Sequence, residues 1–214
     1  MNAGATARLG LRLLLALGLW LAVAVRWGPG LTAAFLPVLH WEIARLDGSF
    51  EVVDLAQAQV GPDRAIRLIA VLRKTLLVGE HVVLPDPRRR ARVSTPAGHL
   101  LQPWVLGLAL ICAWPLPQGG FGAKLVAASA RGAAGVALLA LATLFDLPLL
   151  LLAELHDLYE YAVAPDSLSP GMAWAQFLEG GGRLTLGLAA GLTAIGLGAA
   201  AARLREARTR SRRP

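Results

Sequence analysis

The sequence predicts an α-helical polytopic membrane protein with four transmembrane helices and a small β-rich extracytoplasmic region between the first and second of them. Two observations predict this class. The 214-residue chain is 56% hydrophobic and 16% charged, whereas ordinary soluble domains have about 25% charged residues. The apolar residues also gather in long blocks, which excludes a disordered chain and a conventional soluble enzyme.

Four apolar blocks are long enough, or nearly so, to cross a bilayer. A bilayer core of about 30 Å requires roughly 20 mostly apolar residues in a helix. The blocks cover residues 9–27, 100–116, 132–152 and 184–202. The first block, with Arg8 before it and Arg12 close to its start, also resembles a cleavable signal peptide. Because another apolar stretch follows it directly, we expect it to be retained, and cleavage stays the alternative.

Charged residues predict the orientation, since Lys and Arg in short flanks resist translocation. The basic flanks are the N-terminus, the connection between the second and third blocks, and the tail. Of the 14 acids, seven lie between the first two blocks and five between the last two. We therefore expect both termini in the cytoplasm. The net charge of +7 then reflects topology, and nucleic-acid binding by the tail is the weaker interpretation.

These patterns divide the chain into four regions, with the acidic outer loop 153–183 inside the third. The regions are an N-terminal transmembrane helix with an interfacial segment (1–39), a small β-rich extracytoplasmic region (40–99), a three-helix bundle (100–203) and a basic cytoplasmic tail (204–214). The lipid bilayer is thus the first expected partner, and the localisation is a cytoplasmic membrane crossed several times.

Alternating apolar and polar residues predict strands in the outer region. Residues 49–60 and 65–77 alternate on either side of the turn signal at Gly61, and residues 80–84 predict a third short strand. Two or three strands are marginally stable alone. We therefore expect this sheet to pack on the membrane surface, on its own spans or on a partner protein.

An arginine run and a short polar segment follow the predicted sheet. Arg88, Arg89, Arg90 and Arg92 form either a solvated stretch facing lipid headgroups or a docking surface for an acidic partner or substrate tail. A loop of this length largely escapes the charge rule, so the predicted topology stands. Residues 94–99 are expected to form a capping and turn segment before the second helix.

Asp146 is the one acid predicted inside a span, and ionisable groups there are costly and usually paired or functional. Pro148 lies two residues later and should kink the helix. Arg26 and Arg183 stand at the outer ends of their spans, within reach of the carboxylate. We expect a structural Asp–Arg tie between helices, and a proton-relay or catalytic role is the alternative.

Carboxylates and histidines gather at the outer end of the third block. Glu154 and Asp157 share a helix face at a three-residue spacing, His156 lies beside them, and His99 stands at the same membrane level. Such groups can hold a metal, but no tight ligand motif accompanies them. We therefore expect an interfacial amphipathic turn, with neither a metal nor another cofactor.

Cys112, the single cysteine, lies about 18 Å from the outer end of the second block, counted at 1.5 Å per residue. A nucleophilic cysteine needs a base within hydrogen-bond reach, and both His99 and His156 stand at the opposite membrane face. We therefore expect Cys112 to be a small buried core residue and not a catalytic one.

Small residues in the fourth block favour close helix packing. Gly187 and Gly191 form a Gly-x-x-x-Gly motif, and Gly198 falls on nearly the same face. This motif predicts a packed bundle or a dimer without distinguishing between them.

Several stretches together resemble the exosortase H-associated membrane proteins of bacteria. The stretches are residues 35–37, 40–43, 84–87, 94–99, 101–103 and 177–184. The resemblance covers the chain between about residues 10 and 200. It implies a partnership with an exosortase, a multi-spanning cysteine transpeptidase-like enzyme that processes sorting signals at the outer face of the inner membrane, and it implies no catalytic residues.

Two functional hypotheses follow. The first is a non-enzymatic inner-membrane accessory protein that binds the sorting enzyme or its substrates, with residues 49–84 and the arginine run as the contact surface. The second is a membrane enzyme or a proton-coupled transport component that uses Asp146 with His156 or His99.

Overall fold

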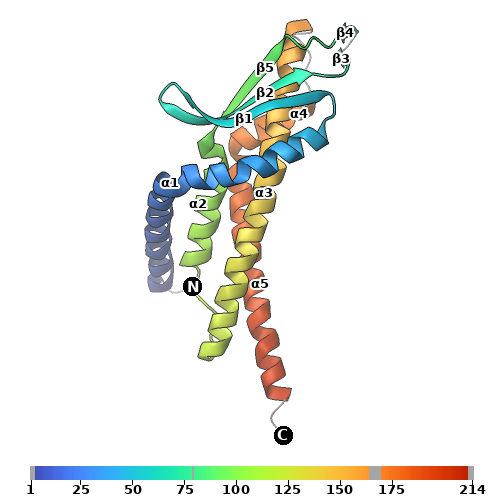
Figure 1. Ribbon diagram of the computed structural model, residues 1–214. Coiled ribbons are helices and arrows are strands. Elements are labelled where there is room, and N and C mark those ends of the chain that lie inside the picture. The colour runs from blue at the N-terminus through green and yellow to red at the C-terminus, as the bar shows by residue number, and fades with distance from the viewer. Residues whose placement is uncertain (1–2, 79, 164–169, 212–214) are drawn as a thin grey trace. The chain divides into compact units, whose positions relative to one another are not determined.

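The computed structural model describes residues 3–78, 80–163 and 170–211. Its elements are labelled in Figure 1. They are α1 (Ala3–Leu46), β1 (Phe50–Val60), β2 (Asp63–Leu72), β3 (Leu76–Val78), β4 (His81–Val83), β5 (Arg90–Pro96), α2 (Ala97–Ala113), α3 (Phe121–Val163), α4 (Pro170–Phe177), the π-helical turn η1 (Leu178–Gly182) and α5 (Arg183–Ser211).

Three helices are long and apolar enough to cross a membrane. They cover Gly4–Leu46, Phe121–Ala162 and Gly171–Thr209. α2 coincides with the second predicted span but has only 17 residues, and about 20 are usual for a crossing helix. The chain is therefore mostly helical, with three helices that could span a membrane and a small sheet region between α1 and α2. The count of four spans stays a prediction.

The helices extend beyond the apolar blocks that predicted them. α1 continues to Leu46 through Pro29 and Pro37. α3 begins at Phe121 and ends at Val163, so residues 153–163, which we placed in an acidic loop, are helical. No glycine or proline interrupts residues 153–163 at the charged C-terminal end of α3, and a helix continues wherever its residues permit the ladder of backbone hydrogen bonds.

The chain forms two compact units. The helix unit contains residues 1–26, 102–142 and 184–214, and the sheet unit contains residues 27–101 and 143–183. Within the helix unit, α3 and α5 bury the small side chains of Ala123, Ala127 and Ala202 together. Small residues at such contacts let helix backbones approach closely, as they do in membrane bundles.

Two side chains of the helix unit stand out, and one of them differs from expectation. Cys112 is exposed, so its prediction as a buried core residue is wrong; its neighbours Ile111 and Ala113 are buried, and Cys112 lies on the other face of α2. Arg131 is buried and donates to the carbonyl oxygens of Trp114 and Pro115 at 2.8 and 3.3 Å. It thereby satisfies carbonyls at the end of α2 that lack a helical partner.

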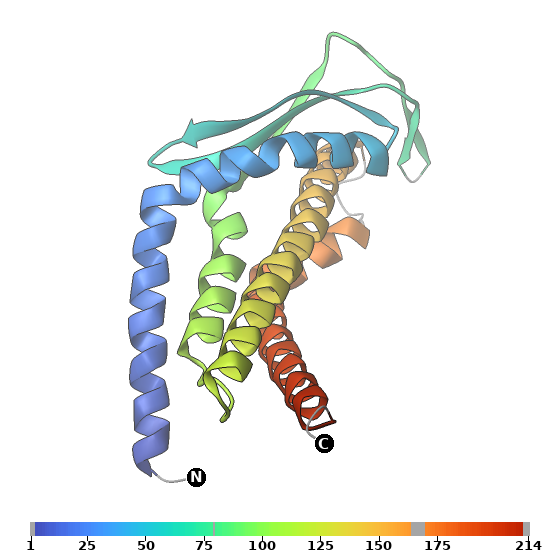
Figure 2. The same cartoon turned by 60° about the horizontal axis from the view of Figure 1, so that its bottom comes forward.

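The sheet unit is built on a three-stranded antiparallel sheet in the order β1–β2–β5, with β3 and β4 pairing separately. Leu68 of β2 lies opposite Leu55 of β1 and Val93 of β5. Figure 1 and Figure 2 show this sheet lying along the part of α1 that belongs to the same unit. Gln57 Nε2 donates to the carbonyl oxygen of Pro29 at 2.7 Å and ties the sheet to that helix.

β5 corrects the expectation for residues 94–99. Residues 90–96 form a full strand, and α2 begins directly at Ala97. Ala91, Val93 and Thr95 are buried while the residues between them are exposed. The capping and turn segment is therefore limited to the junction of β5 and α2, because the backbone of residues 90–96 pairs with β2.

The core of the sheet unit combines three sources of apolar side chains. α1 contributes Leu39 and Ile43, the sheet contributes Ile66 and Leu68, and α3 contributes leucines that include Leu151. All five are almost completely buried. Burial of such side chains stabilises a fold by about 1.5–3 kcal/mol each, so the sheet is held by α1 and α3 and does not stand alone.

Candidate functional site

A buried ion pair lies at the centre of the candidate site in the sheet unit. Arg183, the first residue of α5, donates from Nε to Oδ2 of Asp146 on α3 at 3.0 Å. Asp146 is 3% exposed and Arg183 is 2% exposed. Of the two arginines predicted within reach of Asp146, the structure pairs it with Arg183.

A glycine-rich turn positions the arginine. Within η1, Gly181 has a φ of 112°, a backbone conformation that residues with a side chain rarely adopt. A Cβ on Gly182 would lie 2.7 Å from the carbonyl oxygen of Phe177, which is too close for any other residue. The turn therefore requires glycine at both positions, and it places Arg183 where α5 begins.

The ion pair leaves two polar atoms unused among the described residues. Asp146 Oδ1 and Arg183 Nη2 are buried without a hydrogen-bond partner. Buried charges are costly unless paired, so each group stabilises the other's charge, while one acceptor and one donor remain for a bound water or ligand atom.

His156, which the second hypothesis combines with Asp146, binds Asp47 instead. His156 Nε2 lies 2.7 Å from Oδ2 of Asp47, and the rings of His156 and Phe50 are nearly perpendicular at a centroid distance of 5.1 Å. Oδ1 of the same Asp47 accepts a hydrogen bond from the Ser49 amide at 2.8 Å. This contact fastens α3 to the segment between α1 and β1.

The electrostatics of Asp47 follow from these bonds. Burial alone would raise the pKa of Asp47, but the hydrogen bonds from Ser49 and the neighbouring His156 outweigh it and lower the pKa below its usual value. Asp47 is therefore ionised at neutral pH and available to the histidine.

His99 has a third, separate partner. Its Nδ1 lies 2.8 Å from Oγ1 of Thr95, four residues earlier at the end of β5. Each of the three predicted residues thus has its own partner. Asp146 binds Arg183, His156 binds Asp47, and His99 binds Thr95. Glu154 and Asp157, the remaining predicted residues, are partly buried on α3, and Glu154 lies within electrostatic range of Arg183 and Glu179.

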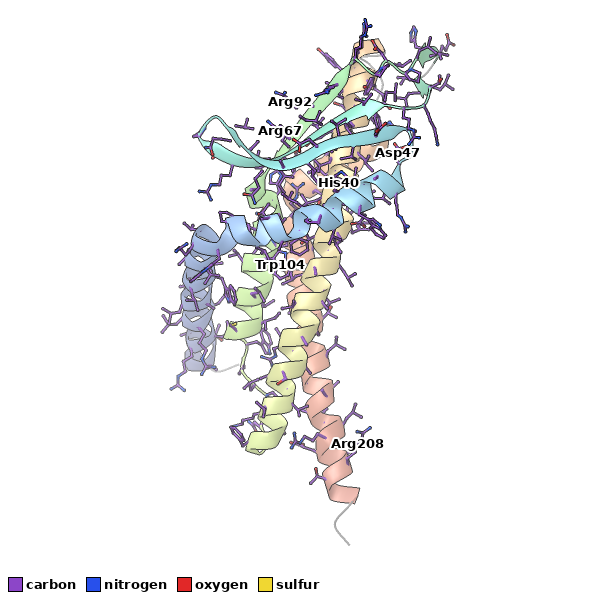
Figure 3. The ribbon with its side chains drawn as sticks, in the orientation of Figure 1. His40, Asp47, Arg67, Arg92, Trp104 and Arg208 are labelled. Carbon is purple, nitrogen blue, oxygen red and sulfur yellow. The ribbon has the colours of Figure 1, made fainter. Side chains whose placement is uncertain are left out.

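The arginine run lies on a defined surface of the sheet. Arg90 and Arg92 of β5 are exposed and lie opposite Val71 and Ile69 of β2, so they share a sheet face with Arg67 of β2. Figure 3 shows Arg67 and Arg92 on this sheet. Arg67 pairs with Asp54 at 3.3 Å. We call these three residues, with Arg88 and Arg89 of the preceding turn, the arginine face.

The three predicted packing glycines of α5 face other helices of the helix unit. A Cβ on Gly187 would lie 2.8 Å from the carbonyl oxygen of Pro103 on α2, and one on Gly198 would lie 2.7 Å from that of Ala127 on α3. A Cβ on Gly191 would lie 3.1 Å from the carbonyl oxygen of Gly107 on α2. These glycines pack α5 within its own chain.

Neither metal-site geometry nor similarity identifies the site. In the ranges that the structure describes, no group of three or more His, Cys, Asp or Glu side chains is arranged to hold a metal ion. Comparisons with family models, curated proteins and solved structures find no match for this chain.

The sequence analysis did not single out Asp47 or Glu179 as site residues. No motif links Asp47 to a histidine 109 residues away.

Proposed function

We propose that this chain is a non-enzymatic accessory protein of an exosortase-type sorting and processing system in the bacterial inner membrane. In this proposal it binds the sorting enzyme or its substrates at the outer face of the membrane. The observation that supports it is the arginine face, because Arg90 and Arg92 are exposed on one face of β5, a strand that pairs with β2. A basic surface of this kind attracts an acidic partner and orients it.

The proposed topology has four spans, with both termini in the cytoplasm and the sheet unit's strands outside. Three long apolar helices support membrane insertion, and α2 is the proposed fourth span. The concentration of acids between the first and second spans and between the third and fourth supports the orientation. This topology exposes the arginine face to a partner at the outer surface.

The candidate site supports a structural role better than a catalytic one. Asp146 is tied to Arg183, and His156 and His99 bind other side chains. A proton-coupled or enzymatic alternative keeps one specific observation in its favour, which is the unpartnered pair of atoms at Asp146 Oδ1 and Arg183 Nη2.

Charge reversal on the arginine face tests the accessory function. The double variant Arg90→Glu/Arg92→Glu should reduce co-purification with the co-expressed exosortase of the same organism by about tenfold, which corresponds to about 1.4 kcal/mol. Arg73→Glu/Lys74→Glu is the matched control, because it makes the same change of charge at exposed positions after β2. Equal co-purification of wild type and both double variants contradicts the proposal.

Asp146→Asn separates the two candidate functions. The accessory function predicts that this variant, when it accumulates normally, still binds the partner and still supports sorting. Loss of sorting with intact accumulation and intact partner binding favours the proton-coupled or enzymatic alternative.

A further inference from the structure

A groove of about 670 Å³ lies in the helix unit, between the first turns of α3 and the last turns of α5. This volume is within the range for small-molecule sites, about 300–1,000 Å³. Beside the groove, α3 and α5 approach closely through the buried alanines Ala123, Ala127 and Ala202. The lining residues are Val126 of α3 and Ala201, Leu204, Arg205, Arg208 and Thr209 of α5.

The lining changes from apolar to basic along the groove. Its five residues from α5 are spaced by three or four positions, which places them on one face of that helix. Ala201 and Leu204, with Val126 of α3, form the apolar end, and Arg205 and Arg208 form the basic end toward the C-terminus. Thr209 Oγ1 donates to the backbone carbonyl oxygen of Arg205 at 2.9 Å, so the arginines supply the donors of the basic end.

Both arginines of the basic end are exposed, and Figure 3 shows Arg208 on the last part of α5. A Cβ on Gly122 would lie 2.7 Å from Nη2 of Arg205, so this guanidinium lies against the first turn of α3. The N-terminal end of a helix has a partial positive charge. The basic end therefore combines positive charge from both helices.

One acid offsets this charge in residues 121–130 and 199–209, which border the groove. The four basic residues there are Lys124, Arg203, Arg205 and Arg208, and the acid is Glu206. Glu206 does not line the groove, and its Oε1 lies 2.5 Å from the place of a Cβ on Gly119. The basic end is therefore complementary to an anion, and the apolar end is complementary to a hydrocarbon segment.

We propose that this groove binds an anionic glycerophospholipid. Its phosphodiester accepts hydrogen bonds from Arg205 and Arg208, and the start of an acyl chain lies along Val126, Ala201 and Leu204. Side chains three positions apart on a helix are about 5–6 Å apart at Cβ, so one phosphate can accept from both guanidinium groups.

The position of the groove in the helices agrees with a lipid ligand. It lies at the ends of two helices that are long and apolar enough to cross a membrane, where apolar residues give way to basic ones. Basic residues at that level favour anionic headgroups. The inference rests on membrane insertion but needs no sorting partner, so its failure leaves the test of the arginine face unaffected.

The two ends of the groove select the ligand together. A zwitterionic phospholipid has an ammonium or choline group that the arginines repel. A soluble phosphate ester has the charge but no hydrocarbon for the apolar end, and burial of apolar area is what holds an acyl chain.

Lipid titration of the full chain in detergent micelles tests the proposal. Phosphatidylglycerol and phosphatidylcholine with identical acyl chains are added in turn, and bound lipid is counted by native mass spectrometry. The wild type should bind phosphatidylglycerol about tenfold more tightly than phosphatidylcholine. An equal concentration of glycerol 3-phosphate should not displace the bound phosphatidylglycerol.

Two kinds of variant test the two ends of the groove. Arg205→Gln and Arg208→Gln should each weaken phosphatidylglycerol binding about fivefold. The matched control is Arg203→Gln, the same change at an exposed position of α5 outside the lining, and it should keep the wild-type affinity. Ala201→Trp fills the apolar end, retains both arginines and should also weaken binding, whereas Ala200→Trp at the exposed neighbouring position should not.

Three results would each overturn the proposal. The first is equal binding of the two lipids by the wild type. The second is displacement of the lipid by glycerol 3-phosphate, which identifies a soluble phosphate site. The third is an equal effect of the groove variants and their controls, because a general attraction between basic residues and anionic lipid does not distinguish Arg205 from Arg203 or Ala201 from Ala200.

Discussion

Two opposite charges, on Asp146 and Arg183, lie almost wholly inside the sheet unit at a distance of 3.0 Å. Truncating one partner leaves the other charge buried and unpaired, which costs about 3–5 kcal/mol. We expect Arg183→Met to lower the free energy of unfolding by this amount in detergent. Replacing both groups, as in Asp146→Leu/Arg183→Met, should recover most of the loss. A double variant as unstable as the sum of the two single variants contradicts a mutual pairing.

A pH dependence is expected from Asp47. The pKa of Asp47 in the folded chain is lowered from the usual 3.8. The ionised carboxylate therefore contributes its full stabilisation of the fold above pH 3.8, and this stabilisation disappears as the pH falls through the lower, folded-state pKa. Asp47→Asn should therefore be less stable than the wild type by about 1 kcal/mol near neutral pH. The difference should vanish in strong acid, as followed by thermal unfolding.

The control for this prediction is Asp63→Asn on the exposed start of β2. Its stability at neutral pH should be close to that of the wild type, because Asp63 is exposed. A wild-type advantage over Asp47→Asn that persists unchanged in strong acid shows that the contact with Ser49 and His156 is not what stabilises this segment.

The sequence predicted which residues belong to the site better than it predicted which partner each of them binds. A lone carboxylate in an apolar block requires a cation, and the sequence narrowed the choice to Arg26 and Arg183. Only the fold selects between them, because the glycines of η1 determine where Arg183 lies. The pairing of His156 with Asp47 was not predictable, since contacts across 109 residues depend on the packing of whole elements.

Among the elements, α5 makes the closest backbone approaches of the helix unit. A Cβ on Gly187 would lie 2.8 Å from a carbonyl oxygen of α2, whereas Gly196 has nothing within 4 Å. Gly187→Val should therefore reduce stability by about 1–3 kcal/mol through overpacking, and Gly196→Val should leave it nearly unchanged. Thermal unfolding in detergent measures both, and equal effects of the two substitutions contradict this packing.

The elements differ in how strongly the sequence signals them. Strands β1 and β2 alternate clearly around the turn at Gly61, and the structure places β1 close to its predicted range. β2 ends at Leu72, before the predicted end at residue 77, and residues 76–78 form the separate strand β3. β5 was missed because Val93 is the one strongly apolar residue among its buried positions, and arginines and other polar residues dominate the pattern around it. The extension of α3 to Val163 was missed because hydropathy identifies the apolar part of a helix and not its charged end.

At the scale of the whole molecule, composition predicts the class of the protein better than any motif predicts its function. Three long apolar helices agree with the membrane class. The apolar face of α1 that includes Leu11, Leu14 and Leu15 is exposed, as lipid contact requires. The partner stays a proposal, because a docking surface such as the arginine face indicates the charge of a partner and not its identity.

The central claim is that the chain spans the membrane with its sheet on the outer side, where the arginine face meets a partner. Single cysteines placed in a Cys112→Ser background at Gln59 of β1 and at Thr209 of α5, both exposed positions, report the two sides. A membrane-impermeant maleimide applied to intact spheroplasts should label Gln59→Cys and leave Thr209→Cys unlabelled until the membrane is broken. Labelling of Thr209→Cys alone before lysis would contradict the account.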